Sequence, residues 1–485
     1  MDKQILNSMK NLPKIEGPIS VTDTSHPFGS AAYTREPIDL EAFGYIEEEY
    51  FLEGTANIYE GMNEALIKNN DIPYKNRILV RKPKTENFSG RVIVDIYNAS
   101  NGYDIEDVWR RSYQYILENG HIYIGITSKP INVLSLKNFD YVRYHTLNWS
   151  GVEQVSQPTT VNLEMSIPGT EEGLVWDMIS HVGNLLRSDN TSFLQGYEIE
   201  NIYLTGQSQS GMYLNTYVNY FDQYNHELNI FDGYLNVVGA GVMRSLNQTE
   251  GNLAQFSAKD QVIPEKLKTP FILLSSQGDI NLFNSFGNRE EIIKELDGEL
   301  LLRHYELTSS PHTDPASPLI QLNSEIVKTK NPPKLLDGEY SYTVNDIQLA
   351  YYVNTMLEKL HNWVTKGIVA PDNLMIERDQ SNTPKKDRFG NGIGGLRSPY
   401  IDVPIATYYP NAIANPDEVN QAVGNVNGSM EFFDKDVLYE LYADKNKYIS
   451  KFKDCVQQNL KDGWLLENDA KRMVQWAVDI AERIF

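Results

Sequence analysis

Two serines lie two residues apart in the stretch GQSQSG, residues 206–211. An uncharged serine hydroxyl is a poor nucleophile. It needs a base to take its proton, a third group to orient that base, and hydrogen-bond donors for the oxyanion. One arrangement that supplies these places the serine on a strained turn between a strand and a helix. The residues two before and two after the nucleophile must then be small, so the flanking residues decide which serine fits.

Ser208 meets this size requirement and Ser210 does not. Ser208 is flanked by Gly206 and Ser210, whereas Ser210 would be flanked by Ser208 and the much larger Met212. An apolar strand at 202–205 precedes the turn, and a proline-free stretch with helical character follows from Ser210. We therefore predict that Ser208 is the nucleophile and that Ser210 takes the place of a second glycine.

His312 and Asp279 are the predicted base and acid. The triad residues of this arrangement follow the chain order serine, acid, histidine. His312 comes just after the apolar run 299–307, which we predict to be the last strand of the sheet, whereas His304 lies inside that run. A loop histidine at the carboxyl end of a strand can reach the serine more easily than a strand histidine. Asp279 follows the strand predicted at 270–276 by three residues and is the acid that we expect.

Two backbone N–H groups are expected to form the oxyanion hole. One belongs to Gln209, the residue after the nucleophile. The other should come from the loop YNASNG, residues 97–102, which follows an early central strand. Its candidate donors are Asn98, Ala99 and Ser100.

Strands and helices alternate along the part of the chain that carries these residues. The stretch 41–59 is predicted to be rich in strand, and the predicted strands cover 77–83, 90–98, 121–128, 202–204, 234–240, 270–277 and 299–307. The predicted helices cover 105–119, 172–188, a stretch from Ser210, 343–366 and most of 434–485. This alternation predicts an α/β fold with a mostly parallel sheet covered by helices on both faces.

The domain organisation follows from the same pattern. We predict a core over 1–366, with N-terminal strands and an insertion at 129–170 that has no clear period, and a C-terminal extension over 367–485 packed on the core. The helix 343–366 has Thr343 and Asp346 placed as a variant capping box and Gly367 as its stop. A connection as long as 129–170 is usually functional or disordered, so we expect it, with part of the tail, to cover the pocket above Ser208 and to restrict substrate size. The alternative for 434–485, which we favour, is that it covers the sheet edge or its helices as scaffold.

Composition limits the partners. The chain has 485 residues, a formal net charge of −22, 41% hydrophobic and 22% charged residues. Such an acidic soluble protein is expected to bind neither nucleic acid nor anionic membranes. The single cysteine, Cys455, excludes an internal disulfide and a thiolate metal site. No apolar run approaches the length of a membrane span. We expect a cytoplasmic protein, and a secreted protein whose signal peptide was replaced by Met1 is the alternative.

No cofactor or metal is expected. The sequence lacks the H-E-x-x-H, Walker A and calcium-loop patterns. Gly390, Gly392 and Gly395 spell G-x-G-x-x-G, but the residues before them do not read as a strand and Pro399 follows closely, so a dinucleotide site is not predicted.

The stretch GQSQSG at 206–211 resembles the G-x-S-Q-S-G elbow of the alpha/beta hydrolase domain family, a group of largely uncharacterised serine hydrolases. Further segments that are similar to this family are 44–59, 92–104, 303–314 and 390–406. Met212 stands where the family often has a basic residue, which implies a different pocket mouth with the same chemistry. The resemblance implies an alpha/beta-hydrolase fold that cleaves carboxylic esters, and it leaves the natural substrate open.

We therefore expect a serine hydrolase that cleaves a small-molecule carboxylic ester through an acyl-enzyme. The alternatives are the same triad acting on a thioester, an amide or a carbon–carbon bond, or in acyl transfer, and a non-catalytic binding protein on the same fold. The presence of all of Ser208, Asp279 and His312 speaks against the binding protein, because a relic tends to lose one member.

Overall fold

The structure, a computed structural model, describes residues 1–154, 166–188, 192–239, 241–248, 267–282, 301–313, 320–333, 343–411 and 426–485. The chain forms two compact units. Unit one comprises Met1–Phe271, Phe286–Leu302 and Pro318–Lys334, and unit two comprises Ile272–Ser285, Arg303–Ser317 and Leu335–Phe485.

The sheet of unit one has the spatial order β1-β2-β3-β5-β4-β6-β7. These strands are β1 (Lys14–Glu16), β2 (Tyr45–Glu60), β3 (Leu66–Pro83), β4 (Arg91–Ile96), β5 (Ile122–Ile126), β6 (Asn201–Gln207) and β7 (Gly233–Val237). The strands β1, β2, β3 and β5 pair with one another in antiparallel fashion. In the centre, β4 pairs parallel with β5 and β6, and β6 pairs parallel with β7. The central parallel strands occur where the sequence predicts them.

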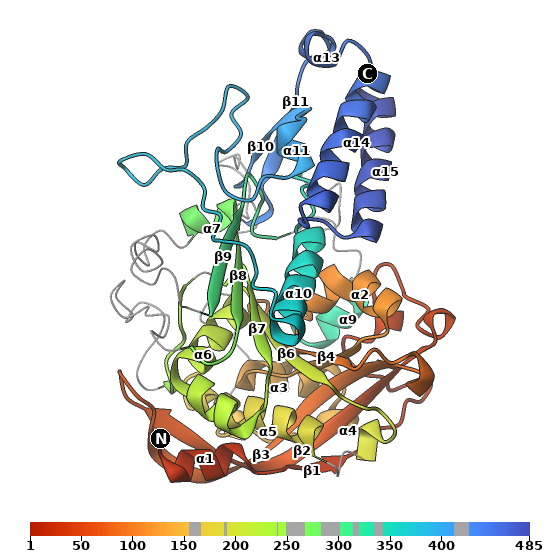
Figure 1. The fold of residues 1–485 in the computed structure, drawn as a ribbon. Helices are drawn as coiled ribbons and strands as arrows, with labels where there is room; N and C mark the ends of the chain where they lie inside the picture. The colour runs from red at the N-terminus through yellow and green to blue at the C-terminus, as the bar shows by residue number, and fades with distance from the viewer. Residues whose placement is uncertain are drawn as a thin grey trace. The chain divides into compact units, whose positions relative to one another are not determined.

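Helices cover both faces of the central strands. In β4, Val92, Ile93 and Val94 are buried in succession, as expected for a strand covered on both sides. The helices α2 (Asp107–Asn119) and α6 (Gln209–Leu228) both pack against β6 and lie on opposite sides of it (Figure 1). Gly120 ends α2 in the left-handed conformation, as the sequence predicts. The remaining helices of unit one are α1 (Lys3–Met9), α3 (Pro130–Phe139), α4 (Tyr141–Tyr144), α5 (Val175–Arg187) and α9 (Asn323–Lys328).

The region 129–170 is more regular than the sequence suggested. It contains the helices α3 and α4 within Pro130–Tyr144, although the sequence there shows no clear period. Seven of the ten residues of α3 are buried, and they include the polar Asn132 and Ser135. A helix that is buried nearly all round shows no polar face, and its sequence therefore shows no helical period. Residues 155–165 lie outside the described part of the chain.

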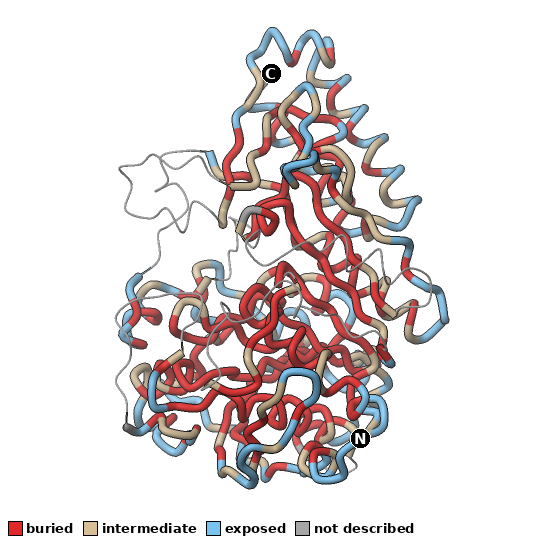
Figure 2. Tube along the Cα trace, turned by 90° about the vertical axis from the view of Figure 1, so that its left-hand side faces the viewer, coloured by how far each residue is buried: buried red, intermediate tan, exposed pale blue. Residues whose placement is uncertain are grey.

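Unit two holds the strands β8 (Phe271–Ser276) and β9 (Leu302–Leu307), except for their first residues, which belong to unit one. Its other elements are α7 (Gln277–Leu282), α10 (Leu349–Lys366), α11 (Pro399–Asp402), β10 (Ala406–Tyr409), β11 (Ser429–Phe432), α13 (Lys435–Tyr442), α14 (Lys445–Lys461) and α15 (Glu467–Ile484). The helices predicted for the tail are confirmed. The helices α14 and α15 lie side by side, and each buries one face, so buried and exposed residues alternate within every turn (Figures 1 and 2).

The long helix α10 starts later than predicted. It begins at Leu349 rather than at residue 343, and no side chain caps its first turn, so the predicted capping box is wrong. The reason is that both proposed capping residues are engaged elsewhere. The Thr343 carbonyl accepts the N–H of Met430 at 2.9 Å, and the Asp346 carboxylate accepts the indole N–H of Trp476 at 3.0 Å. Gly367 ends the helix in the left-handed conformation, as predicted.

The domain division, the single cysteine and the absence of a membrane span were also considered in the sequence. The division into a core over 1–366 and an extension over 367–485 stays a prediction. Cys455 lies half-buried in α14, and this burial raises the pKa of its thiol to about 12. In the described part of the chain, no helix is both long enough and apolar enough to cross a membrane.

Candidate active site

Ser208 lies at the turn where β6 ends and α6 begins. Its backbone has φ +52° and ψ −117°, a conformation that L-residues rarely adopt. Two backbone hydrogen bonds hold it there: the Ser208 N–H donates to the Val237 carbonyl at 2.9 Å, and the Ser208 carbonyl accepts the Met212 N–H at 3.1 Å. This is the strained strand–turn–helix geometry that lifts a serine hydroxyl to the end of a parallel strand.

The two small residues that flank Ser208 are packed tightly. A Cβ atom on Gly206 would lie 2.4 Å from the carbonyl oxygen of Ser210, so no larger residue fits there. The Ser210 hydroxyl accepts the Gln207 N–H and donates to the Gln207 carbonyl, both at 2.9 Å. Ser210 therefore stabilises the turn with its hydroxyl, in keeping with the distinction drawn between the two serines.

The loop after β4 presents one N–H toward the elbow. The Asn98 N–H donates to the Ile105 carbonyl at 3.0 Å, and the Ser100 N–H donates to Asn98 Oδ1 at 2.7 Å. The Ala99 N–H donates instead to Oε1 of Gln209, at 3.3 Å. Among the three candidates of this loop, Ala99 is thus the best placed to serve as an oxyanion donor together with Gln209.

The side chain of Asn98 has a role that the sequence did not indicate. Its Nδ2 donates to the carbonyl of Gln207 at 3.0 Å and to the Gln207 side chain at 3.2 Å. Because Gln207 precedes the serine, Asn98 tethers the loop to the elbow. Sequence analysis considered only the backbone N–H of this residue, since an asparagine in a turn gives no sign of a partner 109 residues away.

A buried charge cluster lies beside the elbow helix. Glu172 accepts hydrogen bonds from Tyr213 of α6 at 2.6 Å and from Arg244 at 2.7 Å, and its other oxygen lies 3.3 Å from Lys129 Nζ. Burial raises the pKa of the Glu172 carboxyl, but Arg244 and Lys129 outweigh this effect and lower the pKa to about 2. This cluster was not predicted from the sequence. The signal that could have found it is that Lys129 and Arg244 each follow a central strand closely.

Asp279 and His312 are brought together in unit two. Asp279 lies in the first turn of α7, directly after β8, and its Oδ1 lies 2.5 Å from Nδ1 of His312. The other carboxylate oxygen accepts the Ser276 N–H at 2.8 Å. Both side chains are buried. This geometry lets the imidazole donate its Nδ1 hydrogen to the carboxylate, the orientation that the base of a catalytic triad requires.

His304, the histidine that was not chosen as the base, is not part of the hydrogen-bonded pair of Asp279 and His312. His304 lies in β9, as expected, and its Nε2 is 2.9 Å from the hydroxyl of Ser275. Ser208 and the loop after β4 belong to unit one, whereas Asp279 and His312 belong to unit two. Within the residues that the structure describes, no group of His, Cys, Asp and Glu side chains could hold a metal ion.

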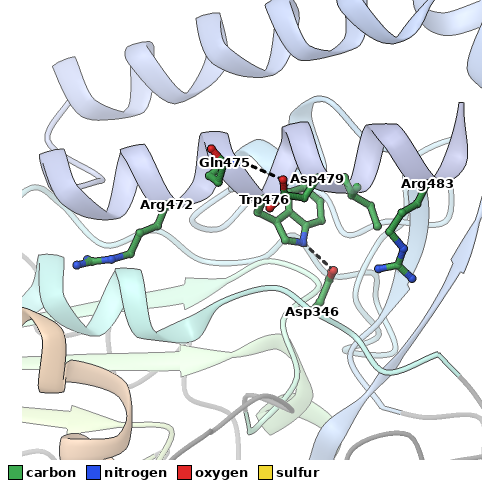
Figure 3. Close-up of a pocket in the computed structure, with 7 residues that line it drawn as sticks. Asp346, Arg472, Gln475, Trp476, Asp479 and Arg483 are labelled. Atoms are coloured by element: carbon green, nitrogen blue, oxygen red, sulfur yellow. Dashed lines mark hydrogen bonds between the residues drawn. The ribbon is translucent and has the colours of Figure 1, made fainter. Parts of the chain in front are cut away.

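A surface pocket of about 370 Å³ lies in unit two (Figure 3). One face of α15 lines it, with Trp476 donating to Asp346 across it. None of the predicted site residues contributes to this pocket. Burial raises the pKa of the Asp346 carboxyl to about 6.

Residues 15–475 match the family described as Alpha/beta hydrolase domain. The chain belongs to this family. The match confirms the family that the sequence resembles, and with it the predicted alpha/beta-hydrolase fold with a C-terminal helical extension. No curated protein matches the chain in sequence.

Several solved structures are similar to this chain at low identity. Esterase B from Lactobacillus rhamnosis is 11% identical, with a TM-score of 0.32 over 67% of this chain and 87% of the esterase. A dienelactone hydrolase from Anabaena variabilis is 12% identical, with a TM-score of 0.27 over 57% of this chain and 92% of that chain. An S-formylglutathione hydrolase from Agrobacterium tumefaciens is 11% identical, with a TM-score of 0.28 over 55% of this chain and 87% of that chain.

Proposed function

We propose that the protein is a serine hydrolase that cleaves a small-molecule carboxylic ester through an acyl-enzyme. The observation that carries the proposal is the backbone of Ser208, held at positive φ between β6 and α6 in a member of a hydrolase family. The hydrogen-bonded pair of Asp279 and His312 supports it, because a serine needs an oriented base to become a nucleophile.

The reaction has two halves. In the first, Ser208 Oγ attacks the ester carbonyl while His312 Nε2 takes the hydroxyl proton, and Asp279 stabilises the imidazolium that forms. The N–H groups of Gln209 and Ala99 stabilise the oxyanion of the tetrahedral intermediate. The intermediate collapses, the C–O bond to the alcohol breaks, and His312 returns the proton to the departing alcohol. In the second half, His312 activates a water molecule that hydrolyses the acyl-enzyme and restores Ser208.

A fluorophosphonate probe tests the nucleophile. The probe should label the wild-type protein at Ser208, and Ser208→Ala should abolish labelling, because the hydroxyl that forms the covalent bond is absent. The matched control is Ser210→Ala, which should keep labelling, since the Ser210 hydroxyl is turned to the backbone of Gln207. Mass spectrometry of the labelled peptide locates the adduct.

Labelling that survives in Ser208→Ala would contradict the proposal.

A substrate panel then resolves the bond that is cleaved. p-Nitrophenyl acetate, the matching thioester and the matching anilide share one acyl group, so the ratio of their kcat/KM values reports the preference for the leaving atom. The proposal expects the ester to be the best of the three, and a better thioester or anilide would favour the alternative reactions.

A further inference from the structure

In the loop that leads to His312, all three polar groups of Ser309 form hydrogen bonds with other segments. The Ser309 N–H donates to Oε1 of Gln277 at 2.8 Å, its hydroxyl accepts the Gly392 N–H at 2.9 Å, and its carbonyl accepts Nδ2 of Asn345 at 2.9 Å. Ser309 has a φ of +57°, which is uncommon for a serine. A residue in such a conformation persists when its surroundings fix it strongly, and here three distant segments do so.

The neighbours of His312 are fixed by the C-terminal extension as well. On the N-terminal side, the Thr308 N–H donates to the Leu396 carbonyl at 3.0 Å, and the Thr308 hydroxyl donates to the Gly394 carbonyl at 2.5 Å. On the C-terminal side, the Thr313 N–H donates to the Val426 carbonyl at 2.9 Å, and the Thr313 hydroxyl donates to Asn427 at 2.7 Å. The extension therefore contacts the chain on both sides of the predicted base.

This contact explains the glycines at 390–395. A Cβ atom on Gly392 would lie 2.4 Å from Oε1 of Gln277 and 2.7 Å from Cγ2 of Thr308. A Cβ atom on Gly395 would lie 2.6 Å from the Glu306 carbonyl oxygen. The backbone of this segment approaches β9 and the loop so closely that only glycine fits. Gly392 thus permits close approach to the side chains of Gln277 and Thr308, and Gly395 to the backbone of β9, whereas Gly390 lies beside Thr407 at a φ of +80°.

We propose that residues 392–396 and 426–427 form a brace that orients His312 toward Asp279. This inference rests on the proposed function and adds a role for the extension: Gly392 and Ser309 are positioning residues that act on the reaction through His312. A loop that leaves a strand samples many conformations unless it is held, and a displacement of about 1 Å at a catalytic group can lower the rate about 10²-fold. The brace fixes one conformation, in which Nδ1 of His312 meets the Asp279 carboxylate.

The substitution Gly392→Ala tests the brace in the full chain. The added methyl group should push Gln277 and Thr308 apart from the extension and move His312. We expect kcat for p-nitrophenyl acetate to fall by about 10²-fold, with little change in KM, because the groups that contact the substrate are unaltered. The matched control is Gly367→Ala in the same extension: nothing lies within 4 Å of the added Cβ atom, and the φ of +65° means that this change costs stability without touching the histidine loop. It should leave kcat within about two-fold of the wild type.

A proton NMR signal separates positioning from general loss of stability. The Nδ1 hydrogen between His312 and Asp279 should give a far-downfield resonance in the wild type, and Asp279→Asn should remove it and so assign it. Gly392→Ala should lose or broaden this resonance while its unfolding temperature stays close to that of Gly367→Ala. If Gly392→Ala fails to fold, Ser309→Ala replaces it, since this change removes one hydroxyl and adds no atom; we expect the same two effects.

The outcomes are distinct. A Gly392→Ala or Ser309→Ala protein that folds, keeps the resonance and keeps wild-type kcat would overturn the brace. A wild-type protein that neither hydrolyses esters nor reacts with the fluorophosphonate would overturn the proposed function instead. In that event the resonance still reports whether the extension orients His312, because it depends on the pair in unit two and needs no active Ser208.

Discussion

The turn that carries Ser208 and the loop that carries His312 are held in place by different kinds of contact. The elbow is tied by hydrogen bonds between residues three apart, as between Ser210 and Gln207, and by the neighbouring strand. The histidine loop is tied to residues 32, 36, 83 and 113 positions away along the chain. The turn at Ser208 therefore has local hydrogen bonds in addition to its ties to Val237 and Asn98, whereas the loop of His312 is held by segments that are distant in sequence.

The largest expected effect comes from the acid. In Asp279→Asn, the amide oxygen must stay with the Ser276 N–H, so the NH₂ group faces Nδ1 of His312 and imposes the wrong tautomer. We expect kcat to fall by about 10⁴, with the fold intact. Steady-state kinetics and a circular dichroism spectrum measure both quantities. A loss of only a few fold would mean that another carboxylate orients the base.

A smaller effect is expected on the elbow side. Asn98→Ala removes the tether between the β4 loop and Gln207, and the N–H of Ala99 should then lose its fixed position. Loss of an oxyanion donor lowers kcat about 10²–10³-fold. Partial misplacement of the Ala99 N–H should therefore lower kcat about 10–10²-fold. Stopped-flow measurement of acylation by p-nitrophenyl acetate gives the rate. The control is the same change at Asn101, three residues further along; equal losses in both variants would remove the special role of Asn98.

The smallest effect concerns the stability of unit two. Burial raises the pKa of Asp346 from 3.8 to about 6, so the folded protein holds this proton more tightly than the unfolded chain does. The stabilisation from that proton is complete below about pH 4 and is lost as the pH rises toward about 6. Above that range, ionisation of the Asp346 carboxyl lowers the free energy of unfolding by at most about 3 kcal/mol. Asp346→Asn removes the charge and keeps an acceptor for Trp476.

We therefore expect Asp346→Asn to raise the unfolding temperature of unit two at pH 7.5 and to give no gain at pH 4. Differential scanning calorimetry at the two pH values measures this. The control is Asp454→Asn, which removes one charge from an exposed site in α14. A gain that is equal at both pH values, or equal in the control, would show that ionisation of Asp346 is not the cause.

The elements that can be predicted from the sequence are those with a local signature. In and just after the stretch 202–211, the sequence shows an apolar strand, a cluster of small residues and a proline-free helical segment. These signals correspond to β6, the turn at Ser208 and α6 in the structure. The pairing of Asp279 with His312 was also predictable, because chain order and strand ends restrict the choice to few residues.

The features that could not be predicted depend on distant contacts or on complete burial. Helix α3 has no polar face, so its sequence has no period. The start of α10 at Leu349 reflects the engagement of Asp346 by Trp476, 130 residues later. The glycine pattern at 390–395 looks like a phosphate loop in sequence, and only its approach to Thr308 and Gln277 shows a different reason for those glycines.

Unit two is assembled from three separate stretches of the chain, and this has a consequence for synthesis on the ribosome. Ser208, Asp279 and His312 all emerge before residues 392–396 and 426–427, which contact the histidine loop. Domains fold during synthesis from the N-terminal side, so the elbow can form while the loop still lacks its supports. The nascent chain would thus carry the three proposed catalytic side chains early, and the brace that we propose could orient His312 only after it has been translated.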